Sequence, residues 1–175
     1  MNATSTLNPP RPAVETPCDC SHKGIAFKRI LVAVDGSPQS EYAVEAATRL
    51  AGQLGGAEIV LVTAFWVDVL TGPEICYVEP EIRATRIEAA QALLDQVKAK
   101  MPAPLKVEKV LREGDAAAEI VAAAQLYEVD LIIMGTHGRG PVGQVFVGSV
   151  ANAVTRKANC PVMTVAHPLP ACKGA

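Results

Sequence analysis

A glycine-rich segment late in the chain has residue types and spacing suited to binding an anion. Five glycines fall within fourteen residues, and Ser149 follows the last of them: Gly135, Gly138, Gly140, Gly143 and Gly148. Glycine lacks a Cβ, so it permits positive φ and lets successive backbone N–H groups converge on one ligand. The free N–H groups and dipole of a following helix would strengthen the site, and Ser149 would add a hydroxyl donor. The pattern therefore predicts a phosphate-binding loop.

The charges around this loop also favour a phosphate ligand. No Asp or Glu occurs after Asp130, whereas Arg139, Arg156, Lys157 and Lys173 do, so this stretch carries a formal charge of +4. Arg139 lies within the loop, where it would either neutralise a terminal phosphate or remain a solvated charge. The alternative is a glycine-rich turn that binds nothing, although five glycines exceed what one turn requires.

Two common phosphate-binding motifs do not explain the segment. A Walker A motif ends in Gly-Lys followed by Ser or Thr, and the chain has no such triplet. A G-x-G-x-x-G sequence does occur at residues 138–143. That fingerprint normally lies in the first βα turn and requires an acidic residue about 20 positions later to bind ribose. Neither condition is met, so we interpret it as a coincidental match.

No catalytic residue can be assigned from the sequence. His137 lies inside the loop, where it would act as an acid or base or simply be solvated. No Ser-His-Asp set and no pair of carboxylates stands out beside it. A second polar cluster, Asp35-Gly36-Ser37, follows the first predicted strand. Asp35 would there either contact a ligand or serve only the turn.

Strand and helix patterns alternate five times along the chain, which predicts a parallel sheet joined by right-handed crossovers. The expected strands are the apolar runs at Arg29–Asp35, Ala57–Trp66, Leu105–Leu111, Asp130–Met134 and Pro161–Ala166. The third run alternates apolar and polar residues, as an edge strand does. The predicted fold class is α/β: a single doubly wound five-stranded parallel sheet flanked by helices, Rossmann-like and of the nucleotide-binding alpha hydrolase type. Ligands of such sheets bind at carboxyl ends of strands, where the strand order reverses.

Helices are expected between these strands. The first would have Ser37 as its N-cap and Pro38 in its first turn. Its apolar stripe would reach Leu54, and Gly55-Gly56 would end it. An irregular segment is expected from residue 67 to about residue 80, because glycine and proline interrupt it.

The length and composition limit the classes of protein to which this chain can belong. At 175 residues the chain fits one domain, and half of its residues are apolar. Lys and Arg total 16 against 18 Asp and Glu, a balance that argues against a protein that coats nucleic acid. No apolar run reaches the roughly 18 residues that a membrane span requires.

The folded domain is expected to span residues 27–168, with a flexible tail at 1–26 and a short C-terminal tail at 169–175. The N-terminal residues show no apolar stretch of an export signal and would not bury enough surface to fold. An odd count of five cysteines indicates reduced thiols and a cytoplasmic location. Cys18, Cys20 and His22 lack the spacing of a zinc site, so no metal site is predicted there.

The glycine segment fits the pattern G-x2-G-x9-G-[S/T] through Gly135, Gly138, Gly148 and Ser149. This pattern resembles the ATP-binding branch of the universal stress protein family. The sequences RILVAVDGSPQSEYAVEAA and CPVMTV are similar to the opening and closing segments of that family. The resemblance covers about residues 27–168 and does not include the N-terminal tail.

The resemblance implies a binding site for ATP and Mg²⁺. Ala33, Val34 and Asp35 would line the nucleoside side. Ala64 would offer backbone groups to the edge of the adenine, and Met134 would flank its ring. The phosphates, bridged by Mg²⁺, would be held by Gly135, Gly138, Arg139, Gly148, Ser149 and Val150.

The resemblance further implies a homodimer that pairs its last strands, Val162–Val165, across a two-fold axis. Its role would be regulatory in a stress response, with an unknown protein partner, and hydrolysis would be slow at most because no residue is evident that positions water. One alternative is a true ATPase or phosphotransferase, which would have to use His137 and Arg139. Another is a scaffold without nucleotide, as in the branch of the family that lacks the glycine motif.

Overall fold

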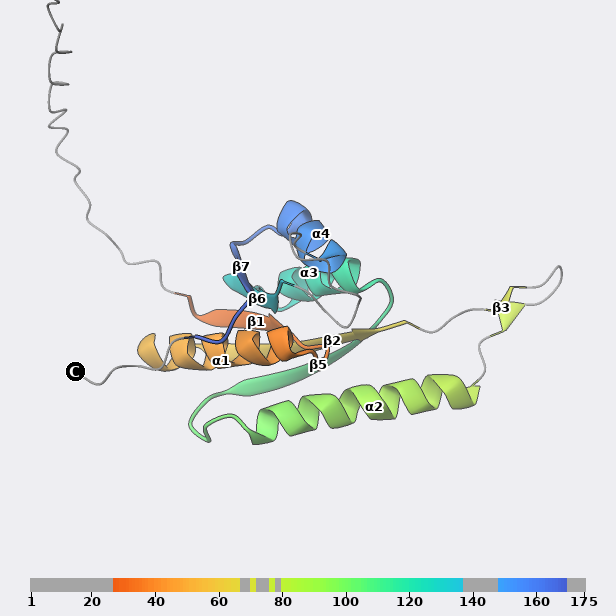
Figure 1. The fold of residues 1–175 in the computed structure, drawn as a ribbon, viewed down its shortest axis with the longest axis horizontal. Helices are drawn as coiled ribbons and strands as arrows, with labels where there is room; N and C mark the ends of the chain where they lie inside the picture. Colours follow the sequence, from red (N-terminus) through yellow and green to blue (C-terminus); the bar gives the residue numbers. More distant parts are fainter. Residues whose placement is uncertain (1–26, 67–69, 72–75, 78–79, 137–147, 170–175) are drawn as a thin grey trace, which may run out of the picture.

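Five parallel strands form the central sheet of the computed structural model (Figure 1). The structure describes residues 27–66, 70–71, 76–77, 80–136 and 148–169. The strands of the sheet are β1 (Arg29–Ala33), β2 (Glu58–Phe65), β5 (Val107–Glu113), β6 (Leu131–Gly135) and β7 (Val162–Val165). Their order is β5-β2-β1-β6-β7, and every neighbouring pair is parallel. The predicted doubly wound five-stranded sheet is therefore confirmed.

Two described helices cover each face of the sheet (Figure 1). One face carries α1 (Pro38–Gln53) and α2 (Pro80–Ala99), and the other carries α3 (Ala116–Leu126) and α4 (Ser149–Lys157). Each helix connects the end of one strand to the start of another, as right-handed crossovers require. The sheet therefore lies between two helical layers and buries a separate apolar cluster on each face.

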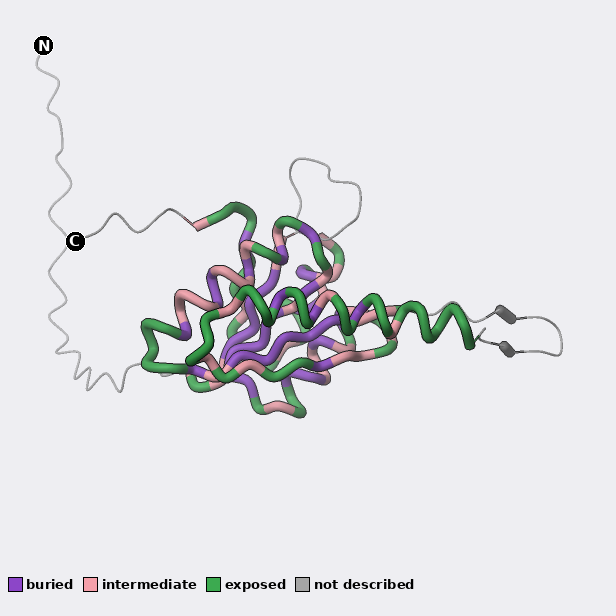
Figure 2. Tube along the Cα trace, turned by 90° about the horizontal axis from the view of Figure 1, so that it is seen from below, coloured by how far each residue is buried: buried purple, intermediate pink, exposed green. Residues whose placement is uncertain are grey.

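The strand sequences explain why both faces are buried. In β1, Ile30 and Val32 pack in the cluster under α1 and α2, while Leu31 packs in the cluster under α3 and α4. All three side chains are fully buried, because a parallel sheet covered on both faces needs apolar residues in succession. Figure 2 shows the buried strands running through the centre and the outer surface of α2 exposed.

The turn between β1 and α1 forms as its polar residues predict. Ser37 is the N-cap of α1, and its Oγ accepts a hydrogen bond from the Ser40 N–H at 3.2 Å. Pro38 occupies the first turn, where its missing N–H leaves no helical hydrogen bond unmade. Gly36 has φ of 76°, a conformation that glycine adopts without strain.

The end of α1 corrects one part of the predicted apolar stripe. The helix ends at Gln53, and Leu54 is 38% exposed. Gly55 and Gly56 follow with φ of 76° and 101°, so they end the helix as predicted. The prediction that Leu54 packs in the core is wrong because the chain has already left the helical path there. Ala51 is the last buried residue of the helix instead.

Two other segments differ from the prediction in detail. β5 begins at Val107 instead of Leu105 and continues to Glu113, but it is an edge strand as expected. Within the segment predicted to be irregular, β3 (Leu70–Thr71) and β4 (Cys76–Tyr77) pair as antiparallel strands. Strands of two residues are too short to leave a periodic pattern in the sequence.

The last described residues pack against the domain. Cys160, which precedes β7, is a free thiol. Burial raises the pKa of this thiol, and the nearby Asp130 carboxylate raises it further. Leu169 packs against the cluster under α1 and α2, so core contacts extend to a residue that was expected to begin the C-terminal tail.

β6 passes very close to the start of α1. A Cβ on Gly135 would lie 2.8 Å from the Cβ of Gln39 and 2.9 Å from its carbonyl carbon. Because one of these contacts is to backbone, a side chain at position 135 would force the helix or the strand to move. Glycine is therefore required where the end of β6 meets the first turn of α1.

We expect Gly135→Ala to lower the free energy of unfolding by about 1–3 kcal/mol, the usual effect of overpacking. Urea denaturation followed by circular dichroism measures it. Gly52→Ala is the control, because a Cβ there meets nothing within 4 Å and the residue lies within α1. That change should stabilise the protein by about 0.5–1 kcal/mol. Equal effects of the two substitutions would contradict the close approach at Gly135.

Candidate functional site

The strand order reverses between β1 and β6, and the ends of these strands define the candidate site. β2 and β5 extend the sheet on one side of β1, whereas β6 and β7 extend it on the other. β1 and β6 pair with Val32 opposite Ile133. Ala33, Asp35 and Gly135 therefore reach the same edge of the sheet. Open α/β sheets bind their ligands in crevices of this kind.

Asp35 is engaged in the turn that follows β1. Its Oδ1 accepts hydrogen bonds from the Ser37 N–H at 2.9 Å and from the Ser37 Oγ at 2.6 Å. Ser37 is buried and caps α1, so Asp35 helps to orient the first turn of that helix. Of the two roles left open by the sequence, the role in the turn is present. Contact with a ligand stays a prediction.

Four predicted site residues lie on the face of the sheet that α3 and α4 cover. Ala33, Met134 and Val150 pack in the same apolar cluster, with Met134 buried and the other two half-buried. Val62 also belongs to this cluster, so alternation along β2 places Ala64 on the same face. Because Ala33 and Ala64 have small side chains, little side-chain volume projects from this part of the sheet.

Val34 lies apart from these residues. Its side chain is 3% exposed and packs in the cluster on the α1 face. Its N–H donates to the Val62 carbonyl at 2.8 Å, and its carbonyl accepts from the Thr63 Oγ1 at 2.7 Å. The fold therefore brings the backbone of Val34 to the candidate site but directs its side chain into the core.

α4 begins beside the end of β6. The Gly148 N–H donates to the Thr136 carbonyl at 2.6 Å, which joins the two described ends of the glycine segment. Gly148 is the N-cap of α4 and supplies no side-chain hydrogen bond to it. The first turn has no acidic residue, and Arg156 and Lys157 lie in the last turn. This distribution complements the helix dipole and leaves the start of α4 suited to an anion.

Several predicted features lie outside the described residues. They are His137, Gly138, Arg139, the G-x-G-x-x-G sequence at 138–143 and the cluster of Cys18, Cys20 and His22. Their assignments stay predictions. Within the part of the chain that the structure describes, no group of three His, Cys, Asp or Glu side chains is placed to hold a metal ion.

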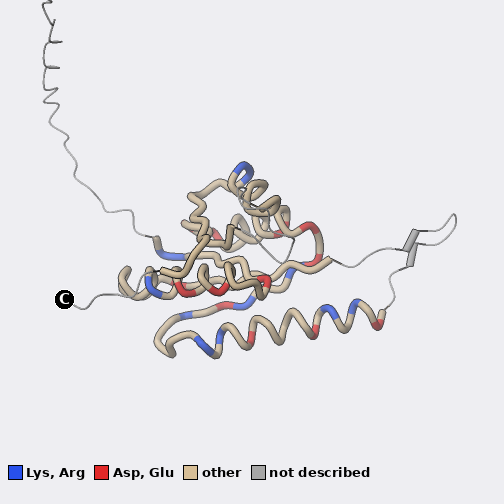
Figure 3. The backbone as a smooth tube through the Cα atoms, viewed as in Figure 1, with Lys and Arg blue, Asp and Glu red and all other residues tan. Residues whose placement is uncertain are grey.

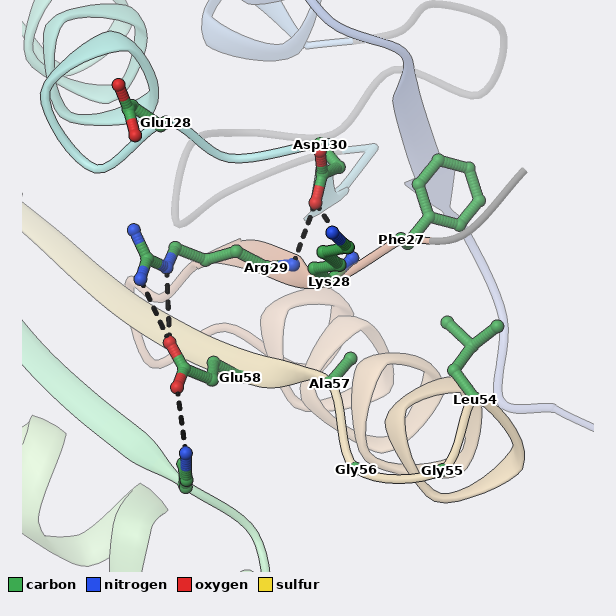
Figure 4. A pocket seen from close by; sticks show the side chains of 11 residues that line it. Phe27, Lys28, Arg29, Leu54, Gly55, Gly56, Ala57, Glu58, Glu128 and Asp130 are labelled. Atoms are coloured by element: carbon green, nitrogen blue, oxygen red, sulfur yellow. Dashed lines mark hydrogen bonds and ion pairs between the residues drawn. The ribbon is translucent and has the colours of Figure 1, made fainter. Parts of the chain in front are cut away.

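A hollow of about 540 Å³ lies at the opposite, amino-terminal edge of the sheet (Figure 4). Glu58 lies there between Arg29 and Lys106, with N–O distances of 3.0 Å and 3.2 Å. The Asp130 Oδ2 accepts from the backbone N–H groups of Lys28 and Arg29 at 2.7 Å and 2.9 Å. Because these contacts tie together the starts of four strands, we interpret the hollow as structural.

A second hollow of about 430 Å³ lies between α1 and α2. Its lining includes Val44, Leu93 and Met101. An ion pair between Lys100 and Glu41 joins the two helices at its rim, at 3.4 Å. This hollow lies on the face of the sheet away from Ala33, and Val34 and Gly36 also line it.

The fold and the reversal of strand order between β1 and β6 define the class: a doubly wound α/β domain with its candidate site at the carboxyl edge of the sheet. The family model of the universal stress protein family matches residues 26–166. The chain belongs to the universal stress protein family.

Individual relatives agree with this assignment. A universal stress protein of Thermus aquaticus is 35% identical over 141 residues, which cover 79% of this chain and 98% of the relative. A crystal structure of a family member from Burkholderia pseudomallei is 30% identical, with a TM-score of 0.64, and the match covers 82% of this chain and 99% of that one.

Two more distant structures share the fold at 22% identity. One is a universal stress protein in complex with cAMP, with a TM-score of 0.62 and coverage of 82% of this chain and 99% of that one. The other is a universal stress protein from Archaeoglobus fulgidus in complex with dAMP, with a TM-score of 0.55 and coverage of 80% and 98%.

Two residues at this edge gave no signal in the sequence. The Thr136 carbonyl joins the start of α4 to β6, but a backbone group does not depend on residue type. Arg112 pairs in register with Ala64 and so lies beside a predicted site residue. A charged residue in an edge strand is usually solvated, and its spacing in the sequence does not distinguish it.

The cations beside Glu58 give a prediction about stability in acid. Hydrogen bonds from Arg29 and then from Lys106 hold the pKa of Glu58 below its ordinary value of 4.5. A carboxyl group whose pKa falls on folding adds stability above its unfolded pKa and loses that contribution as the pH falls through its folded pKa. Glu58→Gln should lower the urea midpoint near neutral pH, and its difference from the native chain should shrink below pH 4.5.

Glu88→Gln is the control for this measurement, because Glu88 is exposed on α2 and lies outside the ion pairs around Glu58. Its urea midpoint should follow that of the native chain at every pH. A deficit of Glu58→Gln that stays constant in acid would show that packing, and not charge, causes it.

Proposed function

We propose that this chain binds MgATP at the carboxyl edge of β1 and β6 and acts as a dimeric regulatory protein in a stress response. The observation that carries the proposal is the start of α4. Its N-cap, Gly148, supplies no side-chain cap and is hydrogen-bonded to Thr136 at the end of β6. Backbone N–H groups at such a helix start, together with the helix dipole, favour a phosphate.

The triphosphate would lie over the end of β6 and the start of α4. Gly135 ends β6 beside this helix start, and Ser149 would add its hydroxyl as a donor. The charged residues that Figure 3 shows on α4 are basic, so no carboxylate of that helix would repel the ligand. The residues proposed to hold the phosphates are Gly135, Gly138, Arg139, Gly148, Ser149 and Val150.

The nucleoside would lie on the face that α3 and α4 cover. It would rest over Ala33 and Ala64, with Met134 beside the ring and the backbone of Val34 and Asp35 near the ribose. The choice of an adenine nucleotide is supported by the two family members of the same fold that were solved with cAMP and dAMP.

Mg²⁺ would enter the site with the nucleotide. This ion prefers oxygen ligands, keeps several waters and is commonly held through substrate phosphates. When bound, it would bridge the phosphate oxygens and offset their charge. The chain would then need to supply the N–H groups that orient the phosphates, for which the start of α4 is suited.

Binding, with hydrolysis slow at most, is the activity we propose. Rapid phosphoryl transfer requires a group that orients the attacking nucleophile and a cation at the terminal phosphate. The Oδ1 of Asp35 is engaged by Ser37, and among the described residues none is evident that positions an attacking water. Occupancy by nucleotide would instead change the affinity of the protein for a regulatory partner that is not yet known.

The homodimer would form through β7. β5 and β7 are the two edge strands of the sheet. β5 carries four charged residues, which discourage pairing between edges: Glu108, Lys109, Arg112 and Glu113. β7 has the uncharged sequence VMTV, and Met163 on it is 39% exposed. An uncharged edge with an exposed apolar side chain favours pairing with a second copy of the chain.

We propose a cytoplasmic location on the basis of the odd count of five cysteines, of which Cys160 is a free thiol. None of the helices in the described ranges is both long and apolar enough to cross a membrane.

Calorimetric titration with MgATP tests the nucleotide site. The native chain should bind with micromolar affinity. A variant that combines Gly138→Val with Ser149→Ala should not bind, because added bulk and the loss of the hydroxyl remove phosphate contacts. Gly52→Ala lies in α1 away from the site and should bind as the native chain does. No binding by the native chain would instead favour a family member that works without nucleotide.

Sedimentation velocity tests the dimer. Met163→Lys should convert the dimer to monomer, because it would place a charge in each of two facing β7 strands. Leu126→Lys is the control, since Leu126 is an exposed apolar residue on α3, 67% accessible and far along the chain from β7. A dimer that survives Met163→Lys unchanged would exclude β7 as the interface.

A further inference from the structure

The hollow between α1 and α2 has the size of a small-molecule site. Its volume of about 430 Å³ falls within the range of about 300–1,000 Å³ that is usual for ligand pockets. The lining residues of α1 recur every four positions, at Ser40, Val44 and Thr48, so they lie along one side of that helix. The opposite wall includes Leu93 of α2 and Met101, which follows that helix. The hollow therefore lies between two helices that cover the same face of the sheet.

Five apolar side chains line the hollow, and three of them are only half-buried. Val34 and Val97 are 3% and 7% exposed, whereas Val44, Leu93 and Met101 have intermediate exposure. All five belong to the cluster under α1 and α2 or pack against it. Removing apolar surface from water is favourable. These five residues, the apolar lining, therefore favour an apolar ligand.

The hydroxyl groups in the hollow already donate to backbone carbonyls. The buried Ser40 Oγ donates to the Ser37 carbonyl at 2.9 Å, and the Thr48 Oγ1 donates to the Val44 carbonyl at 2.8 Å. A polar ligand would give up hydrogen bonds to water, and these two hydroxyl groups would not replace them as donors. Because unreplaced hydrogen bonds cost free energy on burial, the hollow disfavours a ligand rich in polar groups.

The charged residues around the hollow are paired with one another. Lys100 and Glu41 form an ion pair across the two helices at 3.4 Å, and Arg49 pairs with Glu45 on α1. All four residues line the hollow, and their formal charges cancel. A charged ligand would have to compete with one of these existing pairs, so the rim favours a ligand without charge.

The surroundings of the hollow favour a small molecule over a protein partner. Stable protein interfaces bury about 800 Å² on each partner, and their centres are apolar with few charged residues. Here the rim is charged. In the part of the chain that the structure describes, the exposed large apolar side chains lie outside the hollow: Leu54, Trp66, Ile82, Leu126 and Met163.

We propose that the hollow between α1 and α2 binds a small, uncharged apolar molecule. Val34 and Gly36 also line the hollow and belong to the segment that joins β1 to α1, so the ligand would contact this segment from the face that α1 covers. The inference goes beyond the proposed function and does not rest on it, because the nucleotide would lie on the opposite face of the sheet.

Fluorescence titration with N-phenyl-1-naphthylamine tests the inference, since this uncharged aromatic probe emits strongly only in apolar surroundings. The native chain should bind the probe saturably, with one molecule per chain. Leu93→Gln should weaken binding about tenfold, because it replaces an apolar wall with a polar group. Val44→Phe should weaken it by at least as much, because the larger side chain would fill the hollow.

Ile82→Gln is the matched control. Ile82 is an apolar residue of the same helix as Leu93, is 48% exposed and lies outside the hollow. This variant should bind the probe as the native chain does. Thermal melting shows whether each variant is folded, and either Leu93→Gln or Val44→Phe suffices for the test.

Methyl NMR locates the probe on the native chain without any destabilising substitution. The chain has four methionines, and among the described ones Met101 lines the hollow, Met134 packs under α3 and α4, and Met163 lies on β7. The probe should shift the methyl signal of Met101 and leave those of Met134 and Met163 in place. Met101→Leu identifies the signal, because the two side chains have similar volumes.

Competition tests the class of ligand. 1-Decanol should displace the probe at lower concentrations than decanoate or decylamine, because these two bring a charge to a rim whose charges are already paired. Displacement by either charged molecule at equal or lower concentrations than 1-decanol would overturn the assignment of an uncharged ligand.

Three other results would overturn the inference. The first is no saturable binding by the native chain, as expected if another segment of the chain fills the hollow. The second is a probe that shifts Met134 or Met163 instead of Met101, or that binds equally well to folded Leu93→Gln and Val44→Phe. The third is a change of oligomeric state in Leu93→Gln by sedimentation velocity, which would make the hollow an interface between copies. Failure of the chain to bind MgATP would remove the proposed function and leave this inference standing.

Discussion

The central position of β1 is the constraint on which the rest of the structure depends. Ile30, Leu31 and Val32 are completely buried, and the strand pairs with β2 on one side and β6 on the other. Since the sheet is extended in opposite directions from this strand, the connections after β1 and β6 diverge to opposite faces. The carboxyl ends of these two strands are therefore where ligands of such sheets bind. The apolar core thus creates the candidate site before any polar residue is considered.

Close packing then limits which residues can occupy the ends of β1 and β6. The first turn of α1 approaches β6 so closely that Gly135 has no room for a side chain. Asp35 and Ser37 are used to hold the same turn. The residues that shape this turn are therefore engaged in packing and hydrogen bonds within the protein. Glycine content alone does not distinguish a packing role from a ligand-binding role. The start of α4, which has no acidic residue in its first turn, is the basis of the ligand site that we propose.

The sequence predicted the elements whose residues form a clear pattern of apolar and polar positions. Apolar runs predicted the five strands, and the polar turn predicted Ser37 as the N-cap of α1. Leu54 was placed wrongly because helical spacing does not reveal where a helix ends, and the β3–β4 pair was missed because two-residue strands have no period. In the site, the glycine spacing was visible in the sequence. The neighbourhood of Arg112 was not, because it depends on register between strands distant in the chain.

The two edge strands of the sheet, β5 and β7, differ in charge, and this difference affects which of them can pair with another strand. Alternating charges on β5 oppose pairing with another strand, and each charge at its carboxyl end is paired to a helix, Glu113 to α2 and Arg112 to α3. β7 lacks such charges, which agrees with the pairing of β7 with a second copy that we propose. Because β6 lies between β7 and β1, the proposed dimer at β7 would hold the phosphates of the two proposed nucleotides near the interface. The adenine bases of the two nucleotides would lie toward β5, the charged edge strand of each subunit. A structural change at α4, caused by binding of the proposed nucleotide, would then lie closer to the partner subunit than a change near the adenine base.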